Sequence, residues 1–289
     1  MREFREPESI DRQSLSIDSK IPPLSSSDFD IIRNMIESKS GIKLASDKVT
    51  LVENRLRARL NALNMTSYSE YLQYLGGQNP AEIECFIDAL TTHTTQFFRE
   101  SKHFTLIEKL LANGGIPCDK RLDIWCAACS TGEEAYTLAI VLEELCEAYP
   151  YLDYRILASD ISEASIEATK NGIFDKSRSP EIPPHLLIKY FQQNASRTKI
   201  RAKKILRSKI KVRKINLADH NLQVPIKFDI VFLRNVLIYF CEETIERLAL
   251  RVYEGLNPGG HLFIGFAENI GSSRDAFENV DISVFKRKK

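Results

Sequence analysis

One stretch of the chain, residues 121–140, constrains its fold more than any other. It reads RLDIWCAACSTGEEAYTLAI: a short apolar strand, a turn of small residues, and a helix that opens at Glu133. An α/β sheet typically receives a nucleotide-like ligand on such a unit. Small residues let the ligand approach the backbone, and the helix N-terminus offers free N–H groups. We therefore expect an α/β fold with a ligand at this turn.

The charges at the turn select among ligands. Glu133 and Glu134 lie where a phosphate would need positive potential, and no Gly-Lys-Ser/Thr triplet is present. A neutral or cationic ligand with ribose hydroxyls therefore fits better than ATP or NAD. S-adenosylmethionine, a sulfonium that carries a nucleoside, is the candidate cofactor.

The overall composition excludes several classes of protein. A net charge of +1 over 289 residues predicts no global attraction to nucleic acid or membrane. The start of the chain lacks the apolar core of a signal peptide, and no apolar run approaches the ~20 residues of a membrane span. We expect a cytoplasmic monomer with neither membrane insertion nor a nucleic-acid partner.

The six cysteines are scattered along the chain. Cys126 and Cys129 form a C-x-x-C pair, which supplies only half of a closed zinc site. No second pair and no His at ligand spacing accompanies them, so structural thiols are favoured over a zinc or redox site. We expect no metal.

The first 90 residues differ in composition from those that follow. Residues 1–25 are polar, with prolines and serines, and predict a flexible tail. Apolar positions at helical spacing then predict a small helical domain over residues 26–90. Asp28 is the predicted cap of its first helix. The four predicted helices cover residues 29–40, 48–63, 67–75 and 80–90.

Three arginines lie on the second of these helices. Arg55 and Arg59 share a face at i, i+4 and repel each other unless an acidic group lies opposite, whereas Arg57 points elsewhere. A solvated helix face and a docking surface for an acidic partner are equally open interpretations.

From residue 122 onward, strands and helices alternate. The second strand, residues 154–159, ends at Asp160, which places a carboxylate beside the first turn at the C-terminal edge of the sheet. We favour ribose binding over helix capping for Asp160, because Ser162 is better placed to cap. Further predicted strands, which suit a seven-stranded sheet, cover residues 228–235, 261–266 and 283–286.

A basic segment, residues 197–214, interrupts this alternation. Residues 209–215 alternate apolar and basic side chains, which predicts an antiparallel hairpin with a positive outer face. An acidic protein, a membrane surface and a nucleic acid are all open as partners of that face, although no aromatic residue is interleaved for base stacking.

Several segments together resemble one family, the chemotaxis receptor methyltransferases of the CheR type. They cover nearly all of residues 29–285 in the family's order, and the combination of STGEEAY with RNVLIYF is specific. The matching segments are TTHTTQFFRE, IWCAACSTGEEAYTLAI, ILASDISEASIEATKNGIF, INL, FDIVFLRNVLIYF and LNPGGHLFIGFAEN.

The resemblance implies an all-helical N-terminal domain joined to a Rossmann-like, α/β S-adenosylmethionine-dependent methyltransferase domain with an inserted antiparallel β subdomain. The implied division is a tail (1–25), a receptor-docking domain (26–90) and a methyltransferase domain (91–289) with its hairpin near residues 190–215. The implied reaction, part of chemotaxis adaptation, is methyl transfer to glutamate side chains on cytoplasmic chemoreceptor helices, with S-adenosylhomocysteine as product. A glutamate carboxylate is ionised near neutral pH, so alignment of the reactants rather than a base should carry this protein-glutamate O-methyltransferase reaction.

The resemblance also implies roles for individual residues. Arg99 and Tyr239 are expected nearest the transferring methyl, where Arg99 orients a carboxylate and Tyr239 hydrogen-bonds the attacking one. The arginines of the second helix become substrate-docking residues: Arg55, Arg57 and Arg59. The implied cofactor site, with Asp160 at the ribose and Asn216 and Leu217 by the adenine, comprises His93, Thr95, Arg99, Glu134, Asp160, Asn216, Leu217, Arg234 and Asn235.

The sequence departs from the family in two places. His93 stands where members usually carry Asn, so its cofactor contact would be sensitive to pH; without the resemblance, His93 and Arg99 would be read as interdomain packing and surface charge. The hairpin lacks the glycine expected at its turn, so we expect no tight binding of a receptor C-terminal pentapeptide. Two other functions remain open: an RNA methyltransferase of the same fold, and a non-catalytic S-adenosylmethionine-binding regulator.

Overall fold

The computed structural model describes residues 21–77, 79–223 and 226–288. These residues form two compact units, one up to Thr92 together with residues 239–241, and one made of the rest from His93 onward. The predicted flexible tail falls mainly on residues 1–20, which lie outside the described residues. Ile21 and Leu24 are buried, so the predicted tail extends too far at its C-terminal end. No helix in the described part of the chain has the length and apolarity needed to cross a membrane.

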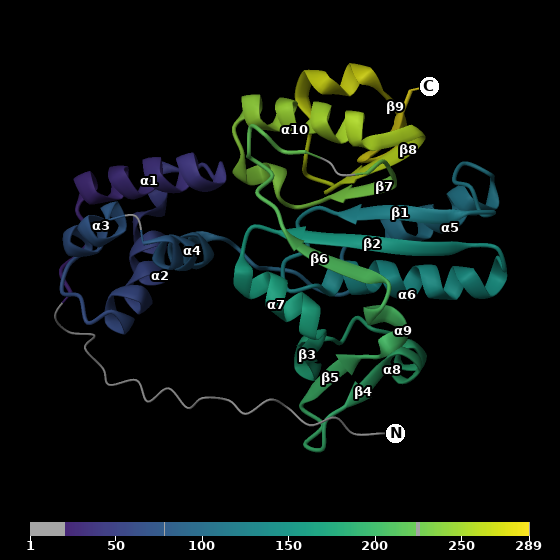
Figure 1. The fold of residues 1–289 in the computed structure, drawn as a ribbon, viewed down its shortest axis with the longest axis horizontal. Coiled ribbons are helices and arrows are strands. Elements are labelled where there is room, and N and C mark those ends of the chain that lie inside the picture. The colour runs from purple at the N-terminus through teal and green to yellow at the C-terminus, as the bar shows by residue number, and fades with distance from the viewer. Residues whose placement is uncertain (1–20, 78, 224–225, 289) are drawn as a thin grey trace. The chain divides into compact units, whose positions relative to one another are not determined.

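The helical unit contains the four helices that the sequence predicts. Three of them are capped at the N-terminus by the side chains of Ser25, Ser67 and Asn79, and Gly41 ends the first helix at φ 74°. The first helix therefore starts earlier than the predicted cap at Asp28. Its elements are α1 (Ser26–Ser40), the 3₁₀ turn η1 (Ser46–Lys48), α2 (Val49–Ala62), α3 (Tyr68–Gly76) and α4 (Pro80–Leu90) (Figure 1).

All three arginines of α2 have partners inside this unit. Arg59 forms a bidentate ion pair with the buried Glu82, at 3.0 and 2.6 Å. Glu82 is therefore the acidic group that offsets the repulsion expected between Arg55 and Arg59. Arg55 donates instead to the carbonyl oxygens at the end of α4, Leu90 (2.8 Å) and Thr91 (3.0 Å). Arg57 pairs with Glu53 one turn away, at 2.7 Å.

These contacts predict unequal effects of two matched substitutions. Arg59→Ala should lower the free energy of unfolding of the helical unit by about 2 kcal/mol, because it removes the cation from a buried carboxylate to which the Tyr71 hydroxyl still donates. Arg57→Ala, which breaks a partly exposed pair, should cost about 0.5 kcal/mol. Urea unfolding followed by circular dichroism measures both. Equal losses would contradict the assignment of Arg59 as a core ion pair.

The second unit is built on a seven-stranded sheet, as predicted. Its order is β6-β2-β1-β7-β8-β10-β9; the first five strands are parallel, and β10 runs antiparallel to both of its neighbours, β8 and β9. β8 begins five residues before the predicted strand, at Leu256, and bulges at the Asn-Pro-Gly-Gly sequence of residues 257–260. The strands are β1 (Arg121–Cys126), β2 (Asp153–Asp160), β6 (Ile210–Lys214), β7 (Phe228–Leu233), β8 (Leu256–Ile264), β9 (Phe277–Asp281) and β10 (Val284–Arg287).

Helices cover both faces of this sheet. α6 and α7 lie on one side, and α10 lies on the other (Figure 1). The core consists of the buried inner faces of the strands, as in the fully buried β7, and of the apolar side of α6. The helices of the unit are α5 (Lys102–Ala112), α6 (Glu133–Ala148), α7 (Glu163–Asn171), α8 (Pro184–Tyr190), α9 (Lys204–Arg207) and α10 (Glu242–Gly255), with 3₁₀ turns η2 (Lys176–Arg178) and η4 (Gly271–Ala276). A further 3₁₀ turn, η3 (Leu237–Tyr239), ends in the helical unit.

The prediction of an antiparallel hairpin at residues 209–215 is wrong. This segment is β6, which pairs in parallel with β2 at the edge of the main sheet. α7 packs against β6, while Lys211 and Arg213 remain exposed. A strand covered on one face produces the same apolar–basic alternation as a hairpin strand, so the pattern could not distinguish them.

The antiparallel insertion instead comprises β3 (Ile173–Asp175), β4 (Phe191–Gln193) and β5 (Lys199–Ala202), in the order β3-β5-β4. The hairpin between β4 and β5 is closed by the Asn194 side chain, which accepts from Lys199 N (3.0 Å) and donates to Ser196 Oγ (2.8 Å). Arg197 takes the left-handed conformation, φ 57°, at the turn for which a glycine is expected. The edge strand β4 is only three residues long.

Candidate functional site

The C-terminal edge of the parallel strands gathers most of the predicted site residues. β1 leads into the small-residue turn, β2 ends at Asp160, and β7 leads into Arg234 and Asn235. Asn216 follows β6, which ends at Lys214. Ligands of open α/β sheets bind at this edge.

The small-residue turn after β1 is held at Ser130. Ser130 adopts φ 49°, and each of its polar groups is engaged. Its N–H donates to Asp160 Oδ2 (2.8 Å), its hydroxyl donates to His93 O (3.1 Å), and its carbonyl accepts from Thr169 Oγ1 (3.1 Å). The turn is thereby fixed against the ends of β2 and α7, and the N-terminus of α6 is fixed with it.

Asp160 is the anchor of this turn and retains acceptor capacity. Its other oxygen accepts from Ser162 N (3.0 Å), while the Ser162 hydroxyl caps α7, as predicted. Burial raises the pKa of Asp160, and the N–H groups of Ser162 and Ser130 oppose that rise. A carboxylate has about four lone-pair sites. The backbone N–H groups around Asp160 therefore leave acceptor capacity for a hydroxyl donor.

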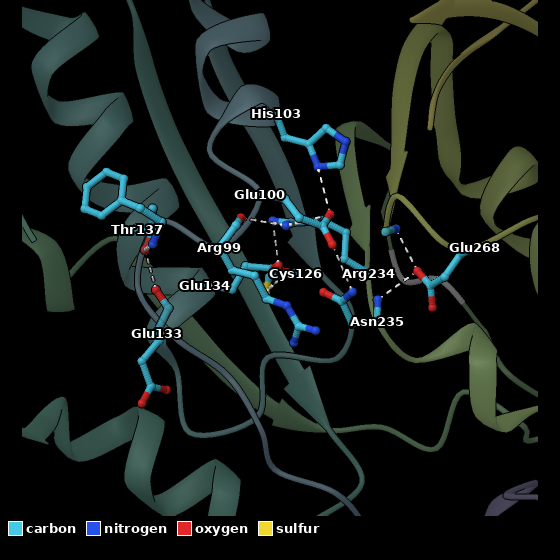
Figure 2. Close-up of polar contacts among 12 residues, drawn as sticks. Arg99, Glu100, His103, Cys126, Glu133, Glu134, Thr137, Arg234, Asn235 and Glu268 are labelled. Carbon is cyan, nitrogen blue, oxygen red and sulfur yellow. Dashed lines mark hydrogen bonds and ion pairs between the residues drawn. The ribbon is translucent and has the colours of Figure 1, made fainter. Parts of the chain in front are cut away.

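Arg234 is the centre of a second cluster (Figure 2). Its side chain is fully buried; Nη1 lies 3.0 Å from Glu134 Oε2, and Nη2 lies 3.0 Å from Glu100 Oε2. Nη2 also donates to the Arg99 carbonyl (2.7 Å), so Arg234 fixes the backbone beside Arg99. Burial raises the pKa of Glu134 and Arg234 opposes that rise, whereas the Asn235 amide and Arg234 outweigh burial and lower the pKa of Glu100.

Strained backbone concentrates around these two clusters. Phe98 (φ 55°), Glu100 (φ 53°), Ser130 (φ 49°) and Asn235 (φ 59°) are non-glycine residues with left-handed backbones. Such conformations cost of order 1–3 kcal/mol each and persist where surrounding contacts over-determine them. Their accumulation at one sheet edge is typical of a functional site.

The remaining predicted residues lie as follows. His93 contacts two elements of the edge, since its Nδ1 lies 3.0 Å from Ser165 Oγ and its carbonyl accepts from Ser130. Arg99 is half-buried and donates to the Thr94 carbonyl at 3.0 Å, while Leu217 is buried. Thr95 is half-buried in the preceding loop. Tyr239 belongs to the helical unit, where its carbonyl accepts from Lys43 N (2.8 Å), so its pairing with Arg99 stays a prediction.

Two residues of the cluster were missed in the sequence. Glu100 binds Arg234 and Asn235, and Glu268 accepts from three backbone N–H groups. Both stand at the ends of segments that carry the family resemblance, TTHTTQFFRE and LNPGGHLFIGFAEN, and that position is the signal that could have identified them.

The C-x-x-C cysteines are both buried. Burial raises the pKa of both thiols, and the Cys126 thiol donates to Glu134 Oε1 (3.3 Å). Within the described ranges, no cluster of three or more His, Cys, Asp or Glu side chains is arranged to hold a metal ion. The pair therefore packs the turn as neutral thiols.

The charges along the edge fit a cationic nucleoside. Two carboxylates share the one guanidinium of Arg234, and Asp160 lies beside Lys214 on the neighbouring strand. The α6 N-terminus carries Glu133 and Glu134 instead of a basic residue. A phosphate would meet carboxylates here, whereas a sulfonium or ammonium and ribose hydroxyls would meet acceptors.

Comparison with known proteins decides among such ligands. Residues 27–91 match the family described as CheR methyltransferase, all-alpha domain, and residues 93–286 match CheR methyltransferase, SAM binding domain. The chain belongs to the CheR methyltransferase family. It is therefore an S-adenosylmethionine-dependent methyltransferase, and S-adenosylmethionine is its cofactor.

Curated CheR relatives match along most of their length. The chemotaxis protein methyltransferase of Salmonella typhimurium is 36% identical over 252 residues, covering 86% of each chain. Chemotaxis protein methyltransferase 2 of Pseudomonas aeruginosa is 35% identical over 260 residues, covering 89% of this chain and 92% of the relative. The Escherichia coli chemotaxis protein methyltransferase is 34% identical over 249 residues, covering 85% of each. The similarity thus spans both units.

The geometry of Asp160 predicts a loss of cofactor affinity on substitution. Asp160→Ala should weaken S-adenosylhomocysteine binding about 100-fold, since it removes a charged acceptor for hydroxyls and leaves the Ser130 N–H without its acceptor. The affinity of Asp160→Asn should lie between that of the parent protein and that of Asp160→Ala, because the amide oxygen still accepts from one backbone N–H. Isothermal titration calorimetry gives both constants. Unchanged affinity in the Ala variant would exclude Asp160 from the ribose.

Two buried histidines predict a pH dependence of stability. Burial lowers the pKa of His103, beside Arg234, and of His261, beside Lys286, to about 4. The unfolded chain takes up these protons near pH 6.5 and the folded chain only near pH 4, so stability should fall as pH drops through this window. Each histidine accounts for up to about 3 kcal/mol of this loss in the free energy of unfolding. Urea titrations from pH 7.5 to 4.5 measure the slope, and His261→Gln should reduce it; an unchanged slope would contradict the assignment.

Proposed function

We propose that the chain methylates glutamate side chains of chemoreceptors, producing γ-glutamyl methyl esters in chemotaxis adaptation. The observation that carries the proposal is a site edge that combines the CheR cofactor domain with a half-buried arginine, Arg99. The names of the curated relatives, chemotaxis protein methyltransferases, support the same assignment. An arginine fork matches a carboxylate in shape and charge.

The proton chemistry of the site agrees with a carboxylate acceptor. His103 is buried with a pKa of about 4, and the Cys126 thiol is held neutral. A glutamate acceptor needs no general base to remove a proton, because its carboxylate is already ionised near neutral pH. The cofactor supplies an electrophilic methyl group on sulfur. The chain then has to orient the carboxylate and exclude water, which can lower the barrier substantially.

We assign the cofactor to the residues gathered at the sheet edge. Asp160 would accept the ribose hydroxyls, and Asn216 and Leu217 would lie by the adenine. Glu134 would face the ammonium or a ribose hydroxyl of the cofactor. Arg234 and Asn235 would hold Glu134 and Glu100 in position beside it. His93 and Thr95 lie in the loop that precedes Arg99. The His93 ring already contacts Ser165, and the His93 carbonyl accepts from Ser130, so His93 would act on the cofactor indirectly, through these two residues.

The helical unit is the proposed receptor-docking part. Arg59 and Arg55 are committed to Glu82 and to backbone carbonyls, whereas the ion pair of Arg57 is with the partly exposed Glu53. Arg57 can therefore turn to an acidic receptor helix at small cost. Arg55 and Arg59, on the same helix, would contribute mainly through the positive electrostatic potential that they add near Arg57. On the three-residue edge strand β4, we expect no tight pentapeptide binding.

The deciding experiment is transfer of radiolabelled methyl from S-adenosylmethionine to chemoreceptor-containing membranes, followed by alkali. We expect label on receptor protein that alkali releases as methanol, which identifies a carboxyl ester. A receptor with Gln at its methylation positions is the matched control and should accept no label.

Two results would replace the proposal. Label in RNA but not in receptor, with salt-sensitive RNA binding, would favour the RNA methyltransferase that the basic segment 197–214 suggests. Binding of S-adenosylhomocysteine without transfer to either acceptor would favour a non-catalytic regulator.

A further inference from the structure

Glu268 holds three backbone N–H groups from two separate strand ends. Its Oε2 accepts from Asn235 N and from Gly265 N, each at 2.7 Å, and its Oε1 accepts from Leu237 N at 2.7 Å. Figure 2 shows this carboxylate directed at the backbone of the segment after β7. One side chain therefore ties the end of β8 to the end of β7.

The backbone that Glu268 holds is strained and adjoins the Arg234 cluster. Asn235 has φ 59°, and its side-chain amide donates to Glu100 Oε1 (3.1 Å). Glu100 in turn pairs with Arg234, which pairs with Glu134. A left-handed asparagine is unfavourable unless other contacts fix it. The three charge-assisted bonds to Glu268 supply such contacts.

Gly265 makes room for this arrangement. A Cβ at Gly265 would lie 2.7 Å from Asn235 Nδ2 and 2.8 Å from Glu268 Oε2, so any larger residue would displace both groups. Gly265 thus gives a second way to disturb the same contacts while leaving every charge in place.

We propose that Glu268 is a positioning residue for the cofactor site: by clamping the N–H groups of Asn235, Leu237 and Gly265, it fixes Asn235 and the Glu100–Arg234–Glu134 cluster for S-adenosylmethionine. The clamp acts through these residues and touches neither the methyl donor nor the acceptor. It rests on the proposed placement of the cofactor at Arg234 and Asn235. It is independent of which acceptor is methylated.

Glu268→Gln tests the clamp with little change of volume. The amide presents one oxygen and one NH₂, so at least one of the three N–H groups loses its acceptor. We expect hydrogen exchange of the Asn235, Leu237 and Gly265 amides to accelerate at least ten-fold by NMR. S-adenosylhomocysteine affinity, by calorimetry at 25 °C on the folded protein, should fall about ten-fold. Glu278→Gln, on the exposed face of β9, is the matched control and should leave both unchanged.

Gly265→Ala should change both quantities in the same direction, and it keeps the test informative if Glu268→Gln fails to fold. Faster amide exchange with unchanged affinity would mean that Glu268 only stabilises the fold, and it would overturn the proposal. Unchanged exchange would overturn it as well. The acceptor of the methyl group does not enter either measurement, so failure here and failure of the glutamate assignment are distinguishable.

Discussion

Arg99→Ala should reduce turnover about a thousand-fold while S-adenosylhomocysteine affinity changes only a few-fold. Loss of a preorganised charged donor at the reacting atoms costs of order 3–4 kcal/mol in the barrier. The binding site should survive because Arg234 holds the Arg99 carbonyl, which the substitution leaves in place. The Arg99 side chain itself bonds only one neighbouring carbonyl, that of Thr94, among the hydrogen bonds described.

Single-turnover methylation of receptor membranes separates this effect from binding. Arg99→Lys is the matched variant, since it keeps the charge and loses the planar fork. We expect Arg99→Lys to recover part of the methylation rate if the positive charge alone is needed. The rate should recover little if a carboxylate must be oriented by two hydrogen bonds. Near-normal turnover in Arg99→Ala would remove this residue from the mechanism.

The sequence predicts the architecture well because its signals are local. Five of the seven strands of the sheet and the four N-terminal helices follow from apolar periodicity, and Asp160 follows from its place at the end of β2. The error at residues 209–215 has a physical origin: a parallel edge strand with one covered face has the same pattern as an exposed hairpin. Pairing direction is a non-local property that this pattern does not encode.

The partners of the site side chains could not be predicted in the same way. Glu82 lies 23 residues from Arg59, and Arg234 lies 134 residues from Glu100, so no local pattern joins either pair. The arginines of α2 illustrate the consequence. Their spacing leaves a solvated face and a docking face equally open, whereas the structure gives each arginine a distinct internal partner.

Arg234→Met should give the largest loss of stability in the methyltransferase unit, about 3–5 kcal/mol. The guanidinium is fully buried between Glu100 and Glu134, so its removal leaves two carboxylates without their cation. Methionine retains contact with the rings of Phe104 and Phe232, over which the guanidinium lies at 5.7 and 5.5 Å. The loss is therefore electrostatic rather than a cavity effect. Arg251→Met, which breaks an exposed pair with Glu254, is the control and should cost less than about 0.5 kcal/mol.

The pH dependence of this loss identifies its cause. Burial already raises the pKa of Glu134, and removal of Arg234 should raise it further, so Glu134 in the variant protonates at higher pH than in the parent. A neutral carboxyl needs no cation, hence the difference in stability between parent and variant should shrink as pH falls from 7 towards 5. Glu134→Gln in the Arg234→Met background should recover part of the loss at pH 7. A difference that stays constant with pH, or a double variant no more stable than the single one, would show that Arg234 acts by packing alone.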